Sequence, residues 1–176
     1  MNCNLGNWDP RCEEIVNKQI NLEFWASYQY HLMWGYFDQS EIGLENIAEF
    51  FKKSSLEERE HGERLMQYQN KRGGKIRFFD ITGTNLDYLQ NSNKNDVLLS
   101  FEKALDMEQT VYRSLLDVHR VAEECNDPQF SDFIESEYLE EQISAFKELS
   151  QYISQLQRIG ENGFGVWSFD QEFKND

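Results

Sequence analysis

The chain is short of the residues on which several functions depend. Its 176 residues include only two prolines, three cysteines and three histidines. The cysteines (Cys3, Cys12 and Cys125) are scattered without metal-ligand spacing, which indicates reduced thiols in a cytoplasmic protein. No apolar run approaches the roughly 18 residues that a membrane span needs. We therefore expect neither a cysteine-bound metal nor a membrane partner.

Signals for export and lipid attachment are also missing from the first residues. Met1 to Gly6 contain neither the basic start nor the apolar segment of a secretory signal. Asn2 stands where N-myristoylation requires glycine. Together with the reduced thiols, these absences favour a cytoplasmic location.

Positive charge is scarce. There are 32 acidic residues against 17 basic ones, which gives a net charge of −15. Binding to the phosphates of a nucleic acid needs clustered Lys and Arg, so we expect no nucleic-acid partner. Negative charge attracts cations instead, and hard cations such as iron, calcium and magnesium prefer oxygen ligands.

What the chain has in abundance is long helical sequence. Asp9-Pro10 is a helix start, with Asp9 as the N-cap and Pro10 at the first helical position. Ser40 is a candidate N-cap for the second helix, and Pro128 opens the fourth. The predicted helices cover about 10–38, 42–72, 95–124 and 128–159, with a short fifth at about 163–172.

Residues 75–94 are different, because they are rich in turn-forming residues. A segment of this length can travel along a bundle and let the next helix run parallel to the previous one. We therefore predict a single all-α domain over residues 1–176. It is a four-helix bundle with one long crossover and a short C-terminal helix.

Glu58-x-x-His61 lies in the middle of the second predicted helix. Residues three apart share one helix face, so a carboxylate and an imidazole can reach the same metal ion. Helical bundles with di-iron sites are built from this unit. A solvated charged face with an incidental histidine is the alternative for such a short motif.

The other long helices each place a polar residue among apolar ones. These residues are Glu23, Glu108 and Gln142, and Tyr30 lies two turns beyond Glu23. Each alone is better explained as a rim or surface residue, because glutamate is rarely buried unless paired. Together with Glu58 and His61 they form a buried carboxylate cluster that would repel itself without cations. Its oxygen-rich ligation favours iron or manganese over zinc.

Several longer motifs occur in the order and spacing of one family. They are Asn21-Leu22-Glu23-x-x-Ala26-Ser27-Tyr28-x-Tyr30, Glu57-Glu58-Arg59-Glu60-His61, Gln69-Asn70-Lys71-Arg72-Gly73-Gly74, Asp132-Phe133-Ile134-Glu135 and Tyr138-Leu139-x-Glu141-Gln142. With them the chain resembles ferritin of the eukaryotic heavy-chain type over essentially its whole length. The resemblance implies a ferritin-like bundle and a ferroxidase centre that holds two irons per subunit. Other divalent cations can occupy such a centre.

The resemblance also assigns roles at this centre. It implies a first iron site at Glu23, Glu58 and His61, with Glu58 bridging, and a second at Glu108 with Gln142 beside it. Glu57 matches a mobile carboxylate that passes iron onward, and Tyr30 matches the tyrosine beside the centre. Only one Glu-x-x-His is present, so we expect the second iron to be held loosely.

Two further sets are implied outside the centre. His119, Asp132 and Glu135 match residues that line three-fold channels for Fe²⁺ entry. Glu60 and Glu63, with Glu57, match the inner surface where ferric mineral nucleates. On the residues alone, the first set is better explained as solvated surface residues, and the second is equally consistent with a charged helix face. In the tail, Ser168 and Glu172 replace the family's leucine and histidine, so its conformation is left open.

The resulting hypothesis is an iron-storage ferroxidase that uses Fe²⁺ and O₂ as substrates. The resemblance implies a hollow shell of twenty-four subunits, either of one kind or co-assembled with another ferritin subunit. Two alternatives remain open. One is a permanent di-iron oxidase or peroxidase, disfavoured by the single Glu-x-x-His. The other is a structural or nucleating subunit without ferroxidase activity, disfavoured by the complete ligand set.

Overall fold

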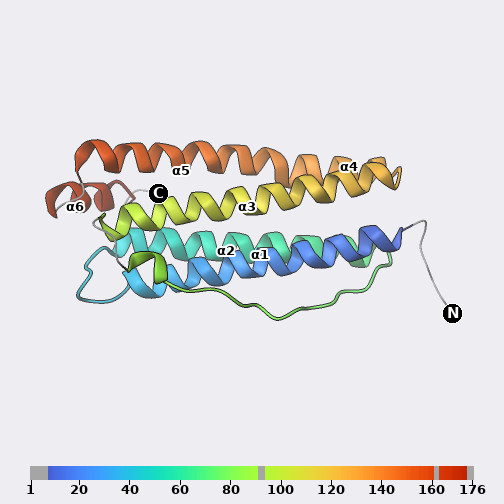
Figure 1. The fold of residues 1–176 in the computed structure, drawn as a ribbon, viewed down its shortest axis with the longest axis horizontal. Coiled ribbons are helices and arrows are strands. Elements are labelled where there is room, and N and C mark those ends of the chain that lie inside the picture. The colour runs from blue at the N-terminus through green and yellow to red at the C-terminus, as the bar shows by residue number, and fades with distance from the viewer. Residues whose placement is uncertain (1–7, 91–93, 161–162, 174–176) are drawn as a thin grey trace.

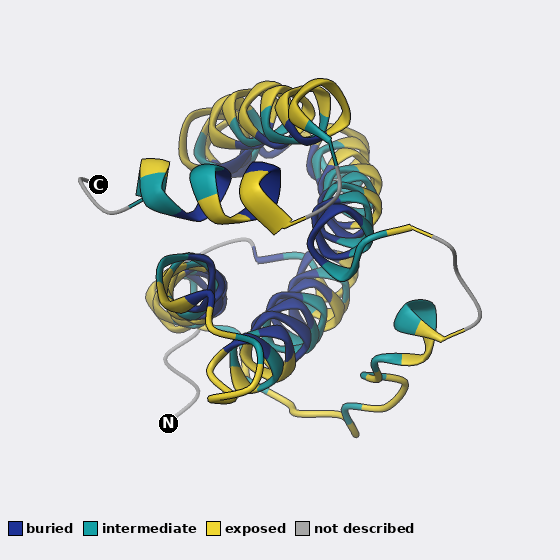
Figure 2. Cartoon of the chain, turned by 90° about the vertical axis from the view of Figure 1, so that its left-hand side faces the viewer, coloured by how far each residue is buried: buried dark blue, intermediate teal, exposed yellow. Residues whose placement is uncertain are grey.

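The computed structural model describes residues 8–90, 94–160 and 163–173, and its architecture is a bundle of long helices. Helices α1 (Pro10–Phe37) and α2 (Glu45–Lys71) form an antiparallel pair. Helix α3 (Asp96–Glu124) is followed by α4 (Pro128–Ile134), η2 (Glu135–Leu139) and α5 (Glu140–Ile159), which continue one another. Helix α6 (Gly163–Glu172) crosses one end of the bundle (Figures 1 and 2). The predicted ferritin-like fold class is confirmed.

The N-terminus of α1 is stabilised by its own N-cap residue and by side chains at the ends of other helices. The Asp9 side chain accepts a hydrogen bond from the Arg11 backbone amide at 2.8 Å, and Pro10 begins the helix. Trp8 is buried and its indole donates to Gln69 on α2 at 3.0 Å. Arg72 at the end of α2 lies over the Trp8 ring and pairs with Asp127, the N-cap of α4. The ends of three helices are thereby fixed together.

Over residues 75–90 the crossover runs along the bundle without regular structure except for η1 (Asp87–Leu89) (Figure 1). Buried amide side chains of α1 hold it. Asn17 donates to the Lys75 carbonyl at 2.9 Å and accepts from the Arg77 amide at 2.8 Å. Gln29 pairs with the backbone of Asn85 in the same way, at 2.8 and 3.0 Å. These amides supply the partners that a strand or helix would otherwise give the backbone.

The start of the second helix differs from the prediction. Helix α2 begins at Glu45, and its N-cap position is Leu44, so the N-cap expected at Ser40 is wrong. Residues 38–42 form turns instead, with the Ile42 amide donating to the Gln39 carbonyl at 2.9 Å. Leucine has no side-chain acceptor, so α2 begins without a cap of its own.

The fourth predicted helix, 128–159, is interrupted by the π-helical turn η2. The extra residue of such a turn re-aims the side chains around it. Tyr138 in η2 is buried, and its hydroxyl donates to the carbonyl of His61 on α2 at 2.9 Å. The turn thus ties this helix to the middle of α2.

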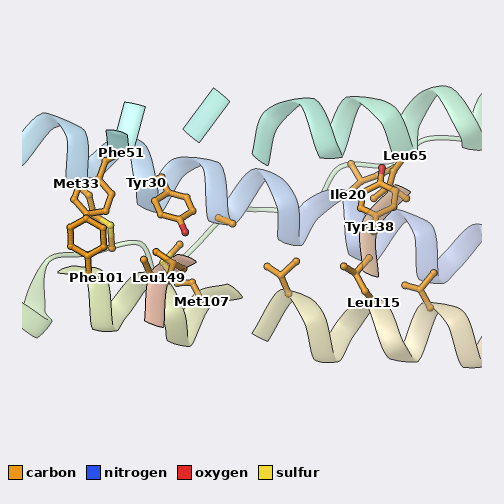
Figure 3. Close-up of a cluster of buried hydrophobic side chains, with 14 of the residues drawn as sticks. Ile20, Tyr30, Met33, Phe51, Leu65, Phe101, Met107, Leu115, Tyr138 and Leu149 are labelled. Atoms are coloured by element: carbon orange, nitrogen blue, oxygen red, sulfur yellow. The ribbon is translucent and has the colours of Figure 1, made fainter. Parts of the chain in front are cut away.

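The apolar core is interrupted in the middle of the bundle. Figure 3 shows two groups of buried side chains, one around Met33, Phe51 and Phe101, the other around Ile20, Leu65 and Tyr138. Between Ile20 and Tyr30 on α1 lies Glu23, which is fully buried. Among the described residues, no helix is both long and apolar enough to cross a membrane.

Candidate metal centre

Three candidate ligands come together at this interruption. Glu23 projects from α1, and Glu58 and His61 project from one face of α2; all three are buried. One ligand atom from each lies within 4.8 Å of the others. A single metal ion could be bound by two carboxylates and an imidazole in this arrangement.

His61 is positioned by contacts on both sides of its ring. Its Nδ1 lies 3.5 Å from Glu58 Oε1, and its Nε2 lies 3.3 Å from Glu141 Oε1. Glu141, on α5, is half exposed and was not among the predicted site residues. It occurs in the motif next to Gln142, but an exposed glutamate at the start of a helical segment gives no local indication of such a role.

Glu108 on α3 forms the other half of the centre. Its Oε1 accepts a hydrogen bond from the Tyr30 hydroxyl at 2.6 Å, and its Oε2 accepts one from Gln142 Nε2 at 2.9 Å. Tyr30, Glu108 and Gln142 are all buried. All six residues predicted for the centre and its tyrosine therefore lie at one place in the bundle.

Polar atoms without partners gather at this centre. Among the described residues, four buried side-chain atoms lack a hydrogen-bond partner, and they are Glu23 Oε2, Glu58 Oε2, His61 Nδ1 and Gln142 Oε1. Leaving a buried acceptor unpaired costs about 1–3 kcal/mol, and more for a charged one. A bound cation would satisfy these atoms, so the donor set fits a metal.

Burial raises the pKa of Glu23 well above its ordinary range, and the nearby charge of Glu58 raises it further. Burial is also the main reason that the pKa of Glu58 is well above its ordinary range, with Glu108 adding to the effect. Both shifts favour the proton over the bare carboxylate charge. A divalent cation would compete with that proton for the same oxygens.

A second layer of side chains orients Glu23. Gln19, one turn earlier on α1, donates from Nε2 to Glu23 Oε1 at 2.7 Å. Ser114 on α3 donates to Gln19 Oε1 at 2.5 Å. Such outer contacts fix the direction of a ligand. Sequence reasoning missed both residues, although Gln19 lies four residues before Glu23 on the same face of α1.

A cavity of about 580 Å³ opens from the centre between α2 and α5. Glu57, Glu141 and Glu148 line it beside Glu58 and His61. Glu57 is exposed, and desolvation by the cavity wall raises its pKa above the ordinary value. The carboxylate predicted to pass iron onward therefore lies on the wall of the cavity next to the centre.

Glu60 and Glu63 lie apart from the centre. Both are exposed on α2, where Glu60 pairs with Arg64 at 3.5 Å and Glu63 with Arg59 at 2.9 Å. Glu63 lines a different groove, between α1 and α2. The geometry alone describes a solvated charged face, so nucleation at these residues stays a prediction.

His119, Asp132 and Glu135 lie near the α3–α4 turn, at the opposite end of the bundle from α6 (Figure 1). His119 Nε2 and Glu135 Oε1 are 2.6 Å apart, and Asp132 and Glu135 border one shallow hollow. The structure brings these three together on the surface. Their role in a channel would require neighbouring subunits and stays a prediction.

Comparison with known proteins identifies the family. The ferritin family model, described as a ferritin-like domain, matches residues 13–159. The chain belongs to the ferritin family. It is 50% identical over 160 residues to ferritin-2, chloroplastic, of Zea mays, covering 91% of this chain and 63% of that ferritin. It is 49% identical to ferritin-3, chloroplastic, of Glycine max, covering 91% and 62%. It is 47% identical to ferritin-3, chloroplastic, of Arabidopsis thaliana, covering 94% and 63%.

The chain thus spans less than two thirds of the length of these related ferritins. Their names also correct one prediction. The expected cytoplasmic location is wrong, because the similar ferritins are chloroplastic. The error has a physical reason: reduced thiols are compatible with any reducing compartment, and charge and composition do not distinguish one such compartment from another.

Proposed function

We propose that the chain is an iron-storage ferritin subunit of the ferroxidase-active type. It oxidises Fe²⁺ with O₂ at the centre described above and passes Fe³⁺ to a mineral store. The observation that supports this most is the set of unpaired buried atoms on Glu23, Glu58, His61 and Gln142. A subunit that served only as structure would have no reason to keep four unsatisfied polar atoms in its core.

Each residue then has a part in handling the substrate iron. Glu23, Glu58 and His61 bind the first Fe²⁺, and Glu108 binds the second, with Glu58 facing both. Glu57 and Glu141, on the cavity wall, offer carboxylates to iron that leaves the centre. The second position has Glu108 and the neutral amide of Gln142, and so few anionic ligands suit Fe³⁺ that must be released after oxidation.

Self-association is supported by an apolar surface on α1, α2 and the crossover. Tyr28, Leu32, Leu56 and Phe78 are exposed there and line a groove of about 890 Å³. Monomeric proteins rarely expose apolar patches of this kind without a partner. We propose a closed shell of twenty-four subunits, of one kind or mixed, located in a plastid like those of the related ferritins.

The experiment follows Fe²⁺ oxidation in air by the absorbance of the ferric product. We expect many irons to be oxidised per subunit, with the ferric iron retained by the protein. In Glu58→Ala/His61→Ala the rate should fall by about 100-fold or more, because two ligands of the first site are lost. Glu14→Ala, which removes an exposed carboxylate of α1, is the control and should keep the original rate.

Two results would overturn the proposal. An unchanged oxidation rate in the double variant would show that Glu58 and His61 do not form the oxidation site. Oxidation that stops after two irons per subunit would favour the permanent di-iron oxidase instead. The size of the native particle, measured by light scattering, tests the shell separately.

A further inference from the structure

Helix α2 receives its N-terminal cap from the other end of the chain. Its own N-cap residue, Leu44, makes no side-chain cap. Instead, Asp170 of α6 accepts from the backbone amides of Asn46 at 3.1 Å and Ile47 at 2.9 Å. Its second oxygen accepts from Asn46 Nδ2 at 2.8 Å. A carboxylate at this place also meets the positive end of the α2 dipole.

The surroundings of Asp170 show that it attaches α6 firmly to α2. It is only 2% exposed, and it is separated from its partners on α2 by more than a hundred residues of sequence. Two glycines allow α6 to fold back so that it reaches α2. Gly160 has a φ of +89°, and a Cβ on Gly165 would lie 2.5 Å from the Gly160 carbonyl oxygen. These two glycines therefore permit the docking of α6.

The docked end of the chain reaches the cavity of the metal centre. Phe173, directly after α6, packs on Phe50 and Tyr152 with ring centroids 5.2 and 5.0 Å away. These three rings line the same cavity as Glu58 and His61. The cavity thus has an acidic end at the centre and an aromatic end that depends on the position of α6.

We propose that Asp170 is a positioning residue that latches α6 onto the start of α2 and so keeps Phe173 as the end wall of the metal-centre cavity. The latch itself rests only on the hydrogen bonds of Asp170. The wall also rests on the proposed function, because it concerns the route of iron to and from the centre. Loss of the latch opens this end of the cavity to solvent.

The latch is tested by amide hydrogen exchange in the assembled protein. In Asp170→Ala the amides of Asn46 and Ile47 lose their acceptor, and we expect their exchange to rise about tenfold, the usual range for losing a cap. In Asp170→Asn the rise should be smaller, because Asn keeps one acceptor oxygen. Glu172→Gln removes the same charge from the exposed side of α6 and should change nothing. Unchanged exchange in Asp170→Ala would overturn the latch.

The wall is tested with Co²⁺, a redox-stable stand-in for Fe²⁺. Release of bound Co²⁺ to EDTA, followed by visible absorption, should be several-fold faster in Asp170→Ala than in the unaltered protein or Glu172→Gln. The Co²⁺ spectrum at saturation should stay the same, because no ligand is touched. Unchanged release together with raised exchange would overturn the wall. Failure of the unaltered protein to bind Co²⁺ would contradict the metal centre and the wall, and exchange would still decide the latch.

Discussion

The two halves of the metal centre are prepared differently for a cation. On α1 and α2, Glu23 and Glu58 each leave one buried oxygen without a partner. On α3, both oxygens of Glu108 already accept hydrogen bonds, from Tyr30 and Gln142. A cation entering the first half satisfies two open carboxylate oxygens. A cation entering the second half finds only the neutral Gln142 Oε1 open, and it must compete for Glu108 with existing hydrogen bonds.

This difference implies that two cations bound at this centre would be held unequally. The first half has two carboxylates and an imidazole within reach of one another. The second half offers Glu108 and the amide of Gln142, which is neutral and cannot balance the charge of a cation. Unequal affinity suits a centre that loads, oxidises and empties again. The following variants test that inequality, beginning with the largest expected effect.

Glu23→Gln should disable the first half. It removes one of the two carboxylates there, and we expect Co²⁺ affinity at the first site to fall about 100-fold by titration calorimetry. It also removes a buried carboxyl whose pKa is raised, so its ionisation with rising pH no longer destabilises the metal-free protein. Above that pKa, the metal-free variant should therefore unfold about 2–4 °C higher than the unaltered protein. A variant that lost affinity and stability together would indicate general damage to the core instead.

Glu108→Gln should weaken only the second half. The two hydrogen bonds to position 108 connect α1, α3 and α5, so Gln can keep part of this network through its carbonyl oxygen. We expect the second Co²⁺ to bind about tenfold more weakly, with the first titration step unchanged. If both steps weakened equally, the two halves would be one coupled site and the comparison would fail.

How far the sequence predicts this centre depends on whether its contacts are local. Glu58 and His61 share a helix face, and Glu23, Glu108 and Gln142 stand among apolar residues, so periodicity marks them as candidates. Their roles come from the resemblance to ferritin. Glu141 gives no such indication, because it reaches His61 only after α5 has packed on α2. The π-helical turn at Glu135–Leu139 is equally hidden, since Tyr138 is anchored by a carbonyl on another helix.

The fold shows the same division between features set by local contacts and features set by contacts distant in sequence. Asp9-Pro10 predicts the start of α1 because a cap acts within its own turn. The start of α2 was predicted at about residue 42 and lies at Glu45, because its cap is Asp170, which no local pattern connects to it. Propensity describes neighbours in sequence, and it cannot describe a cap supplied from the far end of the chain.

The pH dependence of stability should reveal that the carboxyl groups of the first half are costly to ionise without a cation. The pKa values of Glu23 and Glu58 are raised above 4.5 in the folded protein, chiefly by burial. Each carboxyl therefore stabilises the metal-free fold while protonated, and this contribution is lost as pH rises through the folded pKa. Co²⁺ needs both groups ionised, so its stabilising effect should grow over the same range.

The measurement is the unfolding temperature from pH 5 upward, with and without Co²⁺. The metal-free curve should fall with rising pH while the difference between the two curves widens. Glu23→Gln/Glu58→Gln should remove most of both slopes, because glutamine does not titrate. A difference that stayed constant with pH would mean that these carboxyls are ionised before metal arrives.

The smallest expected effect belongs to Tyr30→Phe, and it separates the halves most finely. The change frees Glu108 Oε1 from its hydrogen bond, so the second Co²⁺ should bind a few-fold more tightly, in line with a net hydrogen-bond value of about 1 kcal/mol. Tyr36→Phe is the matched control, because the Tyr36 hydroxyl also donates to a carboxylate, Asp96 Oδ2, at 2.9 Å. Both variants should lose similar stability, but only Tyr30→Phe should change metal affinity. Weaker second-site binding in Tyr30→Phe would show that the hydroxyl orients Glu108 for the metal. The two halves would then differ in the charge of their ligands, and not in whether their carboxylate oxygens are free to bind a cation.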